Sequence, residues 1–562
     1  MIYLFIVRND KMGNKINVNI NNLFSLNEDA GVTVGELAHD YKKVTGNVVA
    51  GARIDNAIVD FDTRLNSDTR VDFFDYTDLA GNKMYQAGLK FIMIIAVREL
   101  WNKIVSFKYS IDKGIYAEFD KKLSDNDIED LRIKMDEIIS YDYPIKKCVT
   151  HRNDAIKYYL STGEIEKAEN ISNIPNSFVE LYEINHSYNY FYTDMPMSTG
   201  ELGLFKLERI DKNAVALMYP RIDSNHKIPE YEYNDKIYNL LGKFNKWSAN
   251  HDVSYAAGLN KLVSTSKIQM FVKMDNIFVN DALYTIAKDI SKKIKTVKLI
   301  LIGGPSSSGK TTSAHRMCTY LETYGVKPIV ISADDYFKER KDNPKDQDGN
   351  YDFECLEALD LGLFNKQMKE LLNGKSVVIP TFNFLTGEKE YKRDPIKLEA
   401  DNVLLIEGLH CLNDAMTKSI PRDAKYKVFV CPFTPLSIDR HNHLSTTDMR
   451  LIRRIVRDNR VRGYKVEDTM KSWPKVKAGE EKYIFPYTND VDAVLNTAYA
   501  YELGVLRVFA EPLLYSVATN SPHYEEARRL LGLLRNFFPI SSEYIEDDNT
   551  LREFIGGSIF EK

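Results

Sequence analysis

The sequence lacks the features that mark secreted, disulfide-rich or membrane-spanning proteins. Its 562 residues contain five cysteines and no C-x-x-C pair, which argues for a reducing compartment and against a disulfide framework or a zinc knuckle. The longest strongly apolar run, residues 91–97, is too short to cross a bilayer. The start, residues 2–7 (IYLFIV), has a strand-like pattern without the charged region and cleavage site of a signal peptide. We expect a cytoplasmic protein with no membrane segment.

The sequence also lacks a strong charge bias. A formal net charge of -5 gives no general attraction to nucleic acid or anionic membrane. The apolar share of 44% suffices for packed cores, and a charged share of 28% is ordinary for a soluble protein. A chain of this length is expected to hold about three or four domains.

One stretch carries a specific motif for binding a nucleoside triphosphate. Residues 299–302 are apolar like a buried strand, and residues 304–311 then satisfy G-x-x-x-x-G-K-[ST] before a helix pattern. Glycines let successive backbone N–H groups point at phosphate oxygens, Lys310 reaches the β- and γ-phosphates, and the Thr311 hydroxyl is placed to ligate Mg²⁺. A chance Gly/Ser-rich loop is the alternative, and the flanking strand and helix argue against it. The predicted phosphate-binding residues are Gly304, Ser306, Ser307, Ser308, Gly309, Lys310, Thr311 and Thr312.

Carboxylates follow two further predicted strands. Asp334 and Asp335 end the segment KPIVISADD, and Glu407 ends VLLIE. Ligands of open α/β sheets lie beyond the carboxyl ends of the strands. An acid there can deprotonate an acceptor hydroxyl, the role we give Asp334, or support Mg²⁺, the role we give Glu407. A surface acid at a strand end is the plain alternative for Glu407.

Four arginines share one predicted helix face. Arg450, Arg453, Arg454 and Arg457 are spaced i, i+3, i+4 and i+7, and like charges at this spacing repel. We expect a triphosphate to offset the repulsion, since guanidinium groups stabilise a transferring phosphoryl group. A nucleic-acid surface and a merely solvated face are the alternatives.

These segments together resemble the uridine kinase/phosphoribulokinase group of P-loop kinases. The motifs are the P-loop, Ala-Asp-Asp-Tyr-Phe, Asn350-Tyr351-Asp352-Phe353, Pro-Thr-Phe-Asn-Phe, Ile-Glu-Gly and the arginine helix, in that order. The resemblance implies that Asp334 is the base for a ribose 5′-hydroxyl and that Asp352 holds the ribose hydroxyls. It implies that Arg450 reaches the nucleoside and that Arg453, Arg454 and Arg457 reach phosphates. Phe337 and Phe382 complete the predicted nucleoside-binding set.

Two departures from the family pattern concern the nucleobase. Phe382 and Asn383 stand where the family has tyrosine and aspartate, and Gly387 stands where it has a base-contacting histidine. Phe382 offers a stacking face and Gly387 offers space, so we expect looser base selectivity than in a dedicated uridine kinase.

The front of the chain resembles parts of threonyl-tRNA synthetases. Residues 1–76 are similar to the TGS domain, a ubiquitin-like β-grasp module. Residues 77–285 resemble the second additional, editing-type domain of threonyl- and alanyl-tRNA synthetases. In that alignment Ala87, Phe91, Phe191 and Met195 replace the histidine and cysteine zinc ligands, so we expect no zinc and no hydrolytic site.

The predicted fold class is therefore α/β. A P-loop kinase domain with a parallel sheet and helices on both faces (290–515) follows a β-grasp domain (1–76) and an α+β synthetase-like domain (77–285). A helical tail (516–562) completes the chain, which as a whole resembles bacterial-type nucleoside kinases with TGS and synthetase-like domains in front. We expect an ATP- and Mg²⁺-dependent nucleoside kinase, a homo-oligomer, with possible RNA contact through the front domains. A phosphoribulokinase-like kinase for another small alcohol and an RNA- or ribosome-associated ATP-binding regulator are the alternatives.

Overall fold

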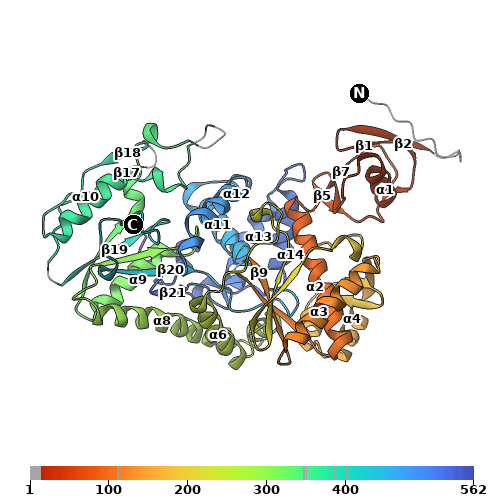
Figure 1. The fold of residues 1–562 in the computed structure, drawn as a ribbon, viewed down its shortest axis with the longest axis horizontal. Coiled ribbons are helices and arrows are strands. Elements are labelled where there is room, and N and C mark those ends of the chain that lie inside the picture. Colours follow the sequence, from red (N-terminus) through yellow and green to blue (C-terminus); the bar gives the residue numbers. More distant parts are fainter. Residues whose placement is uncertain are drawn as a thin grey trace.

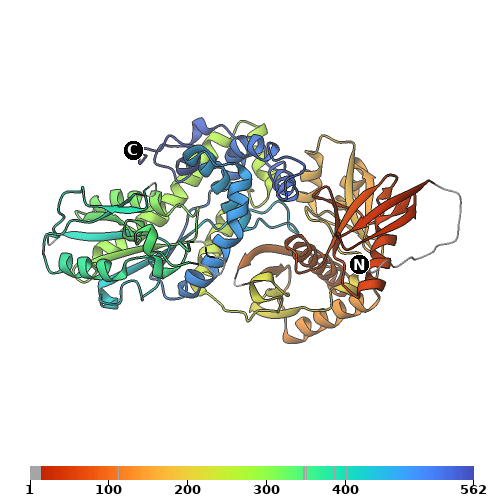
Figure 2. The ribbon, with the colours of Figure 1, turned by 90° about the horizontal axis from the view of Figure 1, so that it is seen from above.

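The computed structural model describes residues 14–111, 113–345, 349, 351–383, 386–399 and 401–561. The molecule is elongated, and both views place the elements in three zones along its long axis (Figures 1 and 2). A parallel sheet lies at one end, the segments before residue 220 lie at the other, and helices α11 to α14 lie between them. The predicted strand at residues 2–7 lies outside the described residues.

The first unit, residues 14–74, is a five-stranded sheet with one helix. Its strand order is β2-β1-β7-β4-β5, and β1 and β7 pair in parallel. The helix α1 begins after Thr33, whose side chain forms a capping box with Glu36, and it ends at Gly46 in the left-handed conformation. The elements are β1 (Lys15–Ile20), β2 (Phe24–Asp29), β3 (Val32–Thr33), α1 (Val34–Thr45), β4 (Gly51–Ile54), β5 (Ala57–Val59), β6 (Arg64–Leu65) and β7 (Thr69–Phe74).

The front unit, residues 79–218, is built on one long buried helix, α2. The apolar residues of α2 pack against a four-stranded sheet of order β13-β14-β9-β8 and against α3. A second sheet, β10-β11-β12, lies beside α4 and α5. The elements are α2 (Leu79–Trp101), β8 (Val105–Ile111), β9 (Gly114–Phe119), α3 (Asp125–Ser140), β10 (Lys146–His151), α4 (Arg152–Ser161), α5 (Ile165–Ser172), β11 (Phe178–Ile184), β12 (Ser187–Asn189), β13 (Lys206–Asp211) and β14 (Ala214–Met218).

The P-loop unit, residues 299–500, holds a parallel sheet of order β16-β19-β15-β20-β21. Alternate residues of β15 face opposite cores: Leu299 and Leu301 pack with α10, whereas Ile300 and Ile302 pack with α8 and α9. Helices therefore cover both faces, as predicted. The elements are α8 (Ile268–Lys292), β15 (Leu299–Gly303), α9 (Lys310–Glu322), β16 (Lys327–Ser332), α10 (Leu361–Leu372), β17 (Thr381–Asn383), β18 (Glu388–Glu390), β19 (Asn402–Glu407), β20 (Lys425–Cys431) and β21 (Ala493–Asn496).

A helical layer joins the sheet to the front unit. Its apolar residues form one core with those of α7 and the first half of α8, so the chain after residue 500 folds back onto the P-loop unit. Its elements are α6 (Asp235–Asn250), α7 (Ala256–Ser264), α11 (Thr446–Arg462), α12 (Val466–Tyr483), α13 (Glu502–Tyr515), α14 (Tyr524–Leu534) and α15 (Arg552–Ile555). Among the described helices, none is both long and apolar enough to traverse a lipid bilayer.

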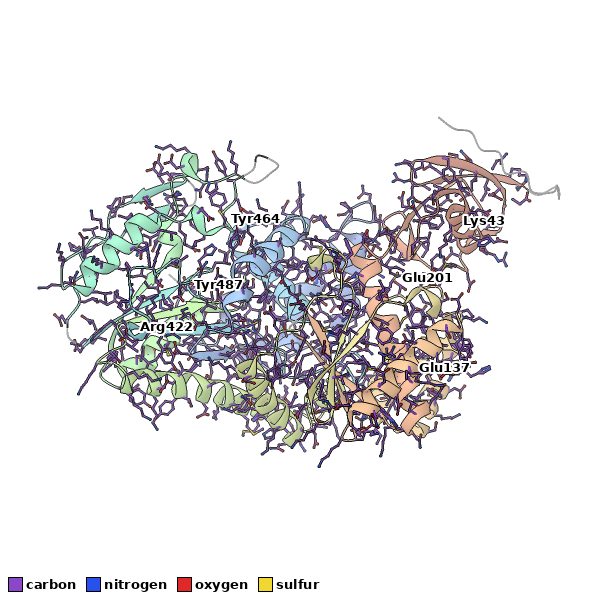
Figure 3. All side chains as sticks on the ribbon, in the orientation of Figure 1. Lys43, Glu137, Glu201, Arg422, Tyr464 and Tyr487 are labelled. Carbon is purple, nitrogen blue, oxygen red and sulfur yellow. The ribbon has the colours of Figure 1, made fainter. Side chains whose placement is uncertain are left out.

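Ion pairs connect the units to one another. Glu201, labelled in Figure 3 below the β-grasp unit, pairs with Lys42 of α1 at 2.5 Å. Lys83 on α2 pairs with Glu526 of α14 at 3.1 Å. Arg440, in the loop before α11, pairs with Glu166 of α5 at 2.6 Å. The units therefore pack through specific contacts between segments that are distant in sequence.

Candidate functional site

The loop between β15 and α9 has the backbone geometry of an anion-binding cradle. Ser307 (φ 59°) and Gly309 (φ 81°) both adopt the left-handed conformation, which turns successive N–H groups toward a common centre. A side chain on Gly304 would collide with the carbonyl oxygen of Val430, so the loop also requires a glycine there. The amino group of Lys310 donates to the Pro305 carbonyl at 3.1 Å, across the loop. This arrangement places a cation and the amino end of α9 around one point.

The carboxyl ends of three parallel strands bring the predicted acids to this loop. Glu407 lies in register with Ile302 of β15 on one side and with Ser332 of β16 on the other. The Ser332 hydroxyl donates to Glu407 at 3.0 Å. Burial and then the nearby charge of Asp334, partly opposed by Lys310, raise the pKa of Glu407 to about 7. Glu407 and Asp334 therefore lie within electrostatic reach of the P-loop lysine.

The two neighbouring aspartates differ in what they contact. Asp335 is engaged by the protein: its carboxylate accepts from the Phe382 N–H at 3.2 Å and from Arg393 at 2.8 Å. Asp334 is exposed, and within the described part of the chain its side chain makes no hydrogen bond. Desolvation by surrounding protein groups raises the pKa of Asp334, Asp335 raises it further, and Lys310 opposes the shift. Asp334 is therefore the acid left available to a ligand.

The oxygen atoms at this edge fit Mg²⁺ better than a softer metal. The Thr311 hydroxyl is exposed on the first turn of α9, and the Glu407 carboxylate lies at the end of the next strand. Mg²⁺ takes few protein ligands and completes its shell with water and phosphate oxygens. No group of three or more His, Cys, Asp or Glu residues that could hold a metal ion occurs among the described residues. Thr311 and Glu407 would hold Mg²⁺ together with a bound triphosphate.

The four positions of the lost zinc site meet in the core of the front unit. Ala87, Phe91, Phe191 and Met195 are all buried in one apolar cluster, with the Phe91 and Phe191 rings 5.5 Å apart. None of the four offers a nitrogen or oxygen donor, and a thioether is a poor ligand for zinc.

Two buried arginines of α11 donate hydrogen bonds to the backbone of the P-loop. Arg450 donates to the Ser306 carbonyl at 2.8 Å and pairs with Glu480, which in turn accepts from the Ser306 N–H at 2.8 Å. Arg453 pairs with Glu502 and donates to the Thr497 carbonyl at 2.9 Å. Both arginine side chains are buried, at 3% and 0% exposed.

The offsetting charge expected from a ligand is thus partly supplied by protein carboxylates. Sequence spacing gives four arginines on one helix face, but it does not show that glutamates 30 and 49 residues away lie against two of them. The contact of Arg450 with a nucleoside stays a prediction, and it requires the Glu480 pair to open.

The side chains of the other two arginines are more exposed than those of Arg450 and Arg453. Arg454 donates to the Ser306 hydroxyl at 2.7 Å, and burial lowers the pKa of its guanidinium. Arg457 donates to Asp458 at 2.9 Å. Arg454 also pairs with Asp458, at 3.2 Å, so an aspartate on the same helix is the counter-charge of both arginines.

The predicted acceptor residues cluster around aromatic rings. The Phe337 ring lies 5.7 Å from that of Phe382 and 5.9 Å from that of Phe353, and Phe353 is the most exposed of the three. Asp352 is half-buried and its carboxylate accepts from the Glu354 N–H at 3.1 Å. Two further residues of these motifs, 350 and 384, lie outside the described residues.

The open space predicted at Gly387 is wrong. A side chain at this glycine would meet Arg340 at 2.8–3.2 Å, because the Arg340 side chain packs directly over it. The backbone reinforces this contact, since the Arg340 N–H donates to the Gly387 carbonyl at 2.9 Å. Sequence comparison shows which residue is missing but not which neighbour fills its place.

Three charged residues near the P-loop were absent from the sequence-based set. Arg454 and Lys310 lie within electrostatic reach of Glu354. The pKa of Glu354 is raised to about 7, mainly by burial, and the two cations oppose this shift. Glu480 holds Arg450, and Arg462 acts on the pKa of Asp334 from the last turn of α11. Arg462 continues the arginine pattern and could have been included, whereas the glutamates have no local signal.

Comparison with known proteins agrees with this geometry. Residues 299–500 match the family model described as "Phosphoribulokinase / Uridine kinase family". This segment is therefore similar to the domain of that family. The chain is 30% identical over 197 residues to "Uridine-cytidine kinase-like 1" of Mus musculus, which covers 34% of the chain and 32% of that protein. It is 26% identical to "Uridine kinase" of Halobacterium salinarum, covering 34% of the chain and 77% of that protein.

The front of the chain matches a different group. The chain is 27% identical over 186 residues to "Threonine--tRNA ligase" of Alkalilimnicola ehrlichii, which covers 32% of the chain and 29% of the ligase. The chain thus spans about a third of the length of the first relatives that it matches. A kinase domain and a region similar to part of a tRNA ligase are joined in one polypeptide.

The buried ion pair between Arg450 and Glu480 predicts a large effect on the free energy of unfolding. Glu480→Gln leaves Arg450 buried without its counter-charge, so we expect a loss of about 3 kcal/mol in the free energy of unfolding. Calorimetry measures this as a fall in Tm of the kinase domain. Glu322→Gln, at an exposed position on α9, is the matched control and should stay within about 0.5 kcal/mol. Equal melting of the two variants would contradict the structural role of the pair.

Proposed function

We propose that the chain transfers the terminal phosphoryl group of ATP to the 5′-hydroxyl of a ribonucleoside. The observation that carries the proposal is the placement of Asp334. Its carboxylate lies at the sheet edge near Lys310 and Glu407 and has no hydrogen-bond partner within the described part of the chain, while Asp335 beside it is held by Arg393. An unengaged carboxylate beside a phosphate cradle suits a general base for an acceptor hydroxyl.

The proposed reaction assigns a role to each group at the P-loop. The acceptor oxygen bonds to the γ-phosphorus, the bond to the β–γ bridging oxygen breaks, and the hydroxyl proton passes to Asp334. Lys310 and the N–H groups of the cradle hold the β- and γ-phosphates, and Arg454 and Arg457 stabilise charge on the transferring group. Mg²⁺, held by Thr311 and Glu407, offsets the charge of the phosphate oxygens when it is bound.

The proposed acceptor is a ribonucleoside because of Asp352 and the aromatic rings near it in sequence and space. Asp352 supplies a carboxylate that accepts hydrogen bonds from a ribose diol, and the exposed ring of Phe353 supplies a face for a base, while Phe337 and Phe382 are buried and support it from the core. Uridine and cytidine are the first compounds to test, as the names of the kinase relatives suggest. The Arg340 guanidinium beside Gly387 adds a charged donor near this region, so base selectivity is left to experiment.

A small-alcohol kinase and an ATP-binding regulator are weaker alternatives. Asp352 and the aromatic rings near it favour a nucleoside over a sugar phosphate. The unengaged Asp334 weighs against a protein that only binds ATP, because binding needs no base. Three further expectations from the sequence remain predictions: contact of the N-terminal domains with RNA, a cytoplasmic location and a homo-oligomeric state.

The role of Asp334 predicts a kinetic signature. Asp334→Asn should lower kcat by roughly two to four orders of magnitude while ATP affinity and Tm change little, because only proton removal is lost. Steady-state kinetics with a responsive nucleoside and calorimetric ATP titration measure these effects. Asp335→Asn should instead lower Tm, since it weakens the contacts to Arg393 and β17. Near-normal turnover of Asp334→Asn would contradict this role.

The role of Asp352 predicts discrimination between sugars. An acceptor without the 2′-hydroxyl leaves a carboxylate oxygen unpaired, at a cost on the order of 1–3 kcal/mol. We therefore expect kcat/KM for 2′-deoxyuridine to be about tenfold or more below that for uridine. Asp352→Asn should narrow this ratio. Equal kcat/KM values in the unmodified protein would refute the assignment.

A further inference from the structure

The end of the chain returns to the P-loop, beyond the last residue that the family model matches. That match stops at residue 500, yet residues 548–561 lie on α9 and α11, and Figure 1 places the C-terminal end near α9. A side chain on Gly309 of the P-loop would collide with the Thr550 methyl group. The His315 ring, one turn along α9, stacks on Phe560 at 5.3 Å with an interplanar angle of 13°.

Arg460 of α11 holds this segment in place. Its guanidinium donates to the Phe554 carbonyl at 3.1 Å and to the Glu553 carbonyl at 3.0 Å, and it pairs with Glu561. The Phe554 ring is fully buried beneath the guanidinium of Arg453, 4.9 Å away. The segment is therefore fixed to both the arginine helix and the P-loop helix.

Glu553 has a different environment from the other acids of this segment. Asp548 pairs with Arg316 at 3.4 Å, and Glu561 pairs with Arg460. The Glu553 carboxylate has no ion pair in the described part of the chain; its one hydrogen bond is accepted by Oε2 from the Thr312 hydroxyl at 2.9 Å. A half-buried carboxylate thus sits on the first turn of the P-loop helix with Oε1 left without a donor.

We propose that Glu553 is a specificity-determining residue of the phosphate-donor site and binds the ribose hydroxyls of the donor nucleotide. This inference rests on the proposed function. In a P-loop, the lysine reaches the β- and γ-phosphates and the next residue reaches the metal. Thr312 follows these two, toward the α-phosphate and the donor sugar. The Thr312 hydroxyl fixes Oε2 and leaves Oε1 for the ligand.

The charge of Glu553 selects the sugar as its partner. A carboxylate facing the triphosphate itself would add repulsion between like charges. The sugar is neutral, and its two hydroxyls are donors that a carboxylate accepts well. Glu553 is within electrostatic reach of Glu407, where the metal already has Thr311 and Glu407 as oxygen ligands. The neutral diol next to the α-phosphate is therefore the part of the donor that this carboxylate complements.

Equilibrium binding to the full-length protein tests the inference without an acceptor. Calorimetry with Mg²⁺ compares ATP with 2′,3′-dideoxy-ATP in the unmodified protein, in Glu553→Gln and in Glu561→Gln. Glu553→Gln keeps the side-chain size and an acceptor for Thr312 but removes the charge. We expect the unmodified protein to bind ATP about tenfold more tightly than the dideoxy analogue. Glu553→Gln should reduce this ratio several-fold by weakening ATP alone, and Glu561→Gln should preserve it.

Each other outcome overturns the inference in a distinct way. Equal weakening of both nucleotides by Glu553→Gln would assign the carboxylate to the metal or the phosphates. Tighter binding of both would make Glu553 a built-in competitor of the triphosphate. ATP binding with no dependence on the sugar hydroxyls would refute the inference and leave the proposed kinase function intact. Absence of ATP binding in the unmodified protein would instead refute the proposed function.

Discussion

The attachment of α11 to the back of the P-loop is the interaction on which the site depends. Two arginines donate hydrogen bonds to the carbonyl oxygens of the adjacent loop residues Ser306 and Ser307, and each is neutralised by a glutamate from another helix. Buried ion pairs lose hydration energy, and they are tolerated here because additional hydrogen bonds engage the charged groups. The cradle therefore depends on segments near residues 306, 450, 480 and 500, which must be assembled together.

The front unit contributes to this assembly through the loop that leads into α11. Phe107 on β8 donates its N–H to the Arg440 carbonyl at 2.7 Å, and Lys90 of α2 donates to the His441 carbonyl at 3.3 Å. On the first turn of α11, Asp448 pairs with Arg529 at 2.6 Å, and Arg529 also pairs with Glu526, the partner of Lys83. The position of the arginine helix is therefore set from both the kinase domain and the front unit.

Local patterns in the sequence predict much of this fold, and the long-range contacts explain what they miss. The P-loop, the α2 helix and the acids at strand ends follow from apolar periodicity and motif spacing. The strand β2 (FSLNED) was not predicted, because its alternation is weak and its residues are mostly polar. The partners Glu480 and Glu502, the packing of Arg340 over Gly387 and the return of Glu553 to α9 join residues that are adjacent only after folding.

Identification of the phosphorylated product decides whether the protein transfers a phosphoryl group from ATP to a ribose 5′-oxygen. The full-length protein is incubated with ATP, Mg²⁺ and either uridine, cytidine, adenosine, guanosine or inosine, and products are resolved by ³¹P NMR and mass spectrometry. We expect at least one ribonucleoside to yield its 5′-monophosphate with an equal amount of ADP. Bound ATP with no phosphorylated nucleoside, or a phosphoryl group on another oxygen, would contradict it.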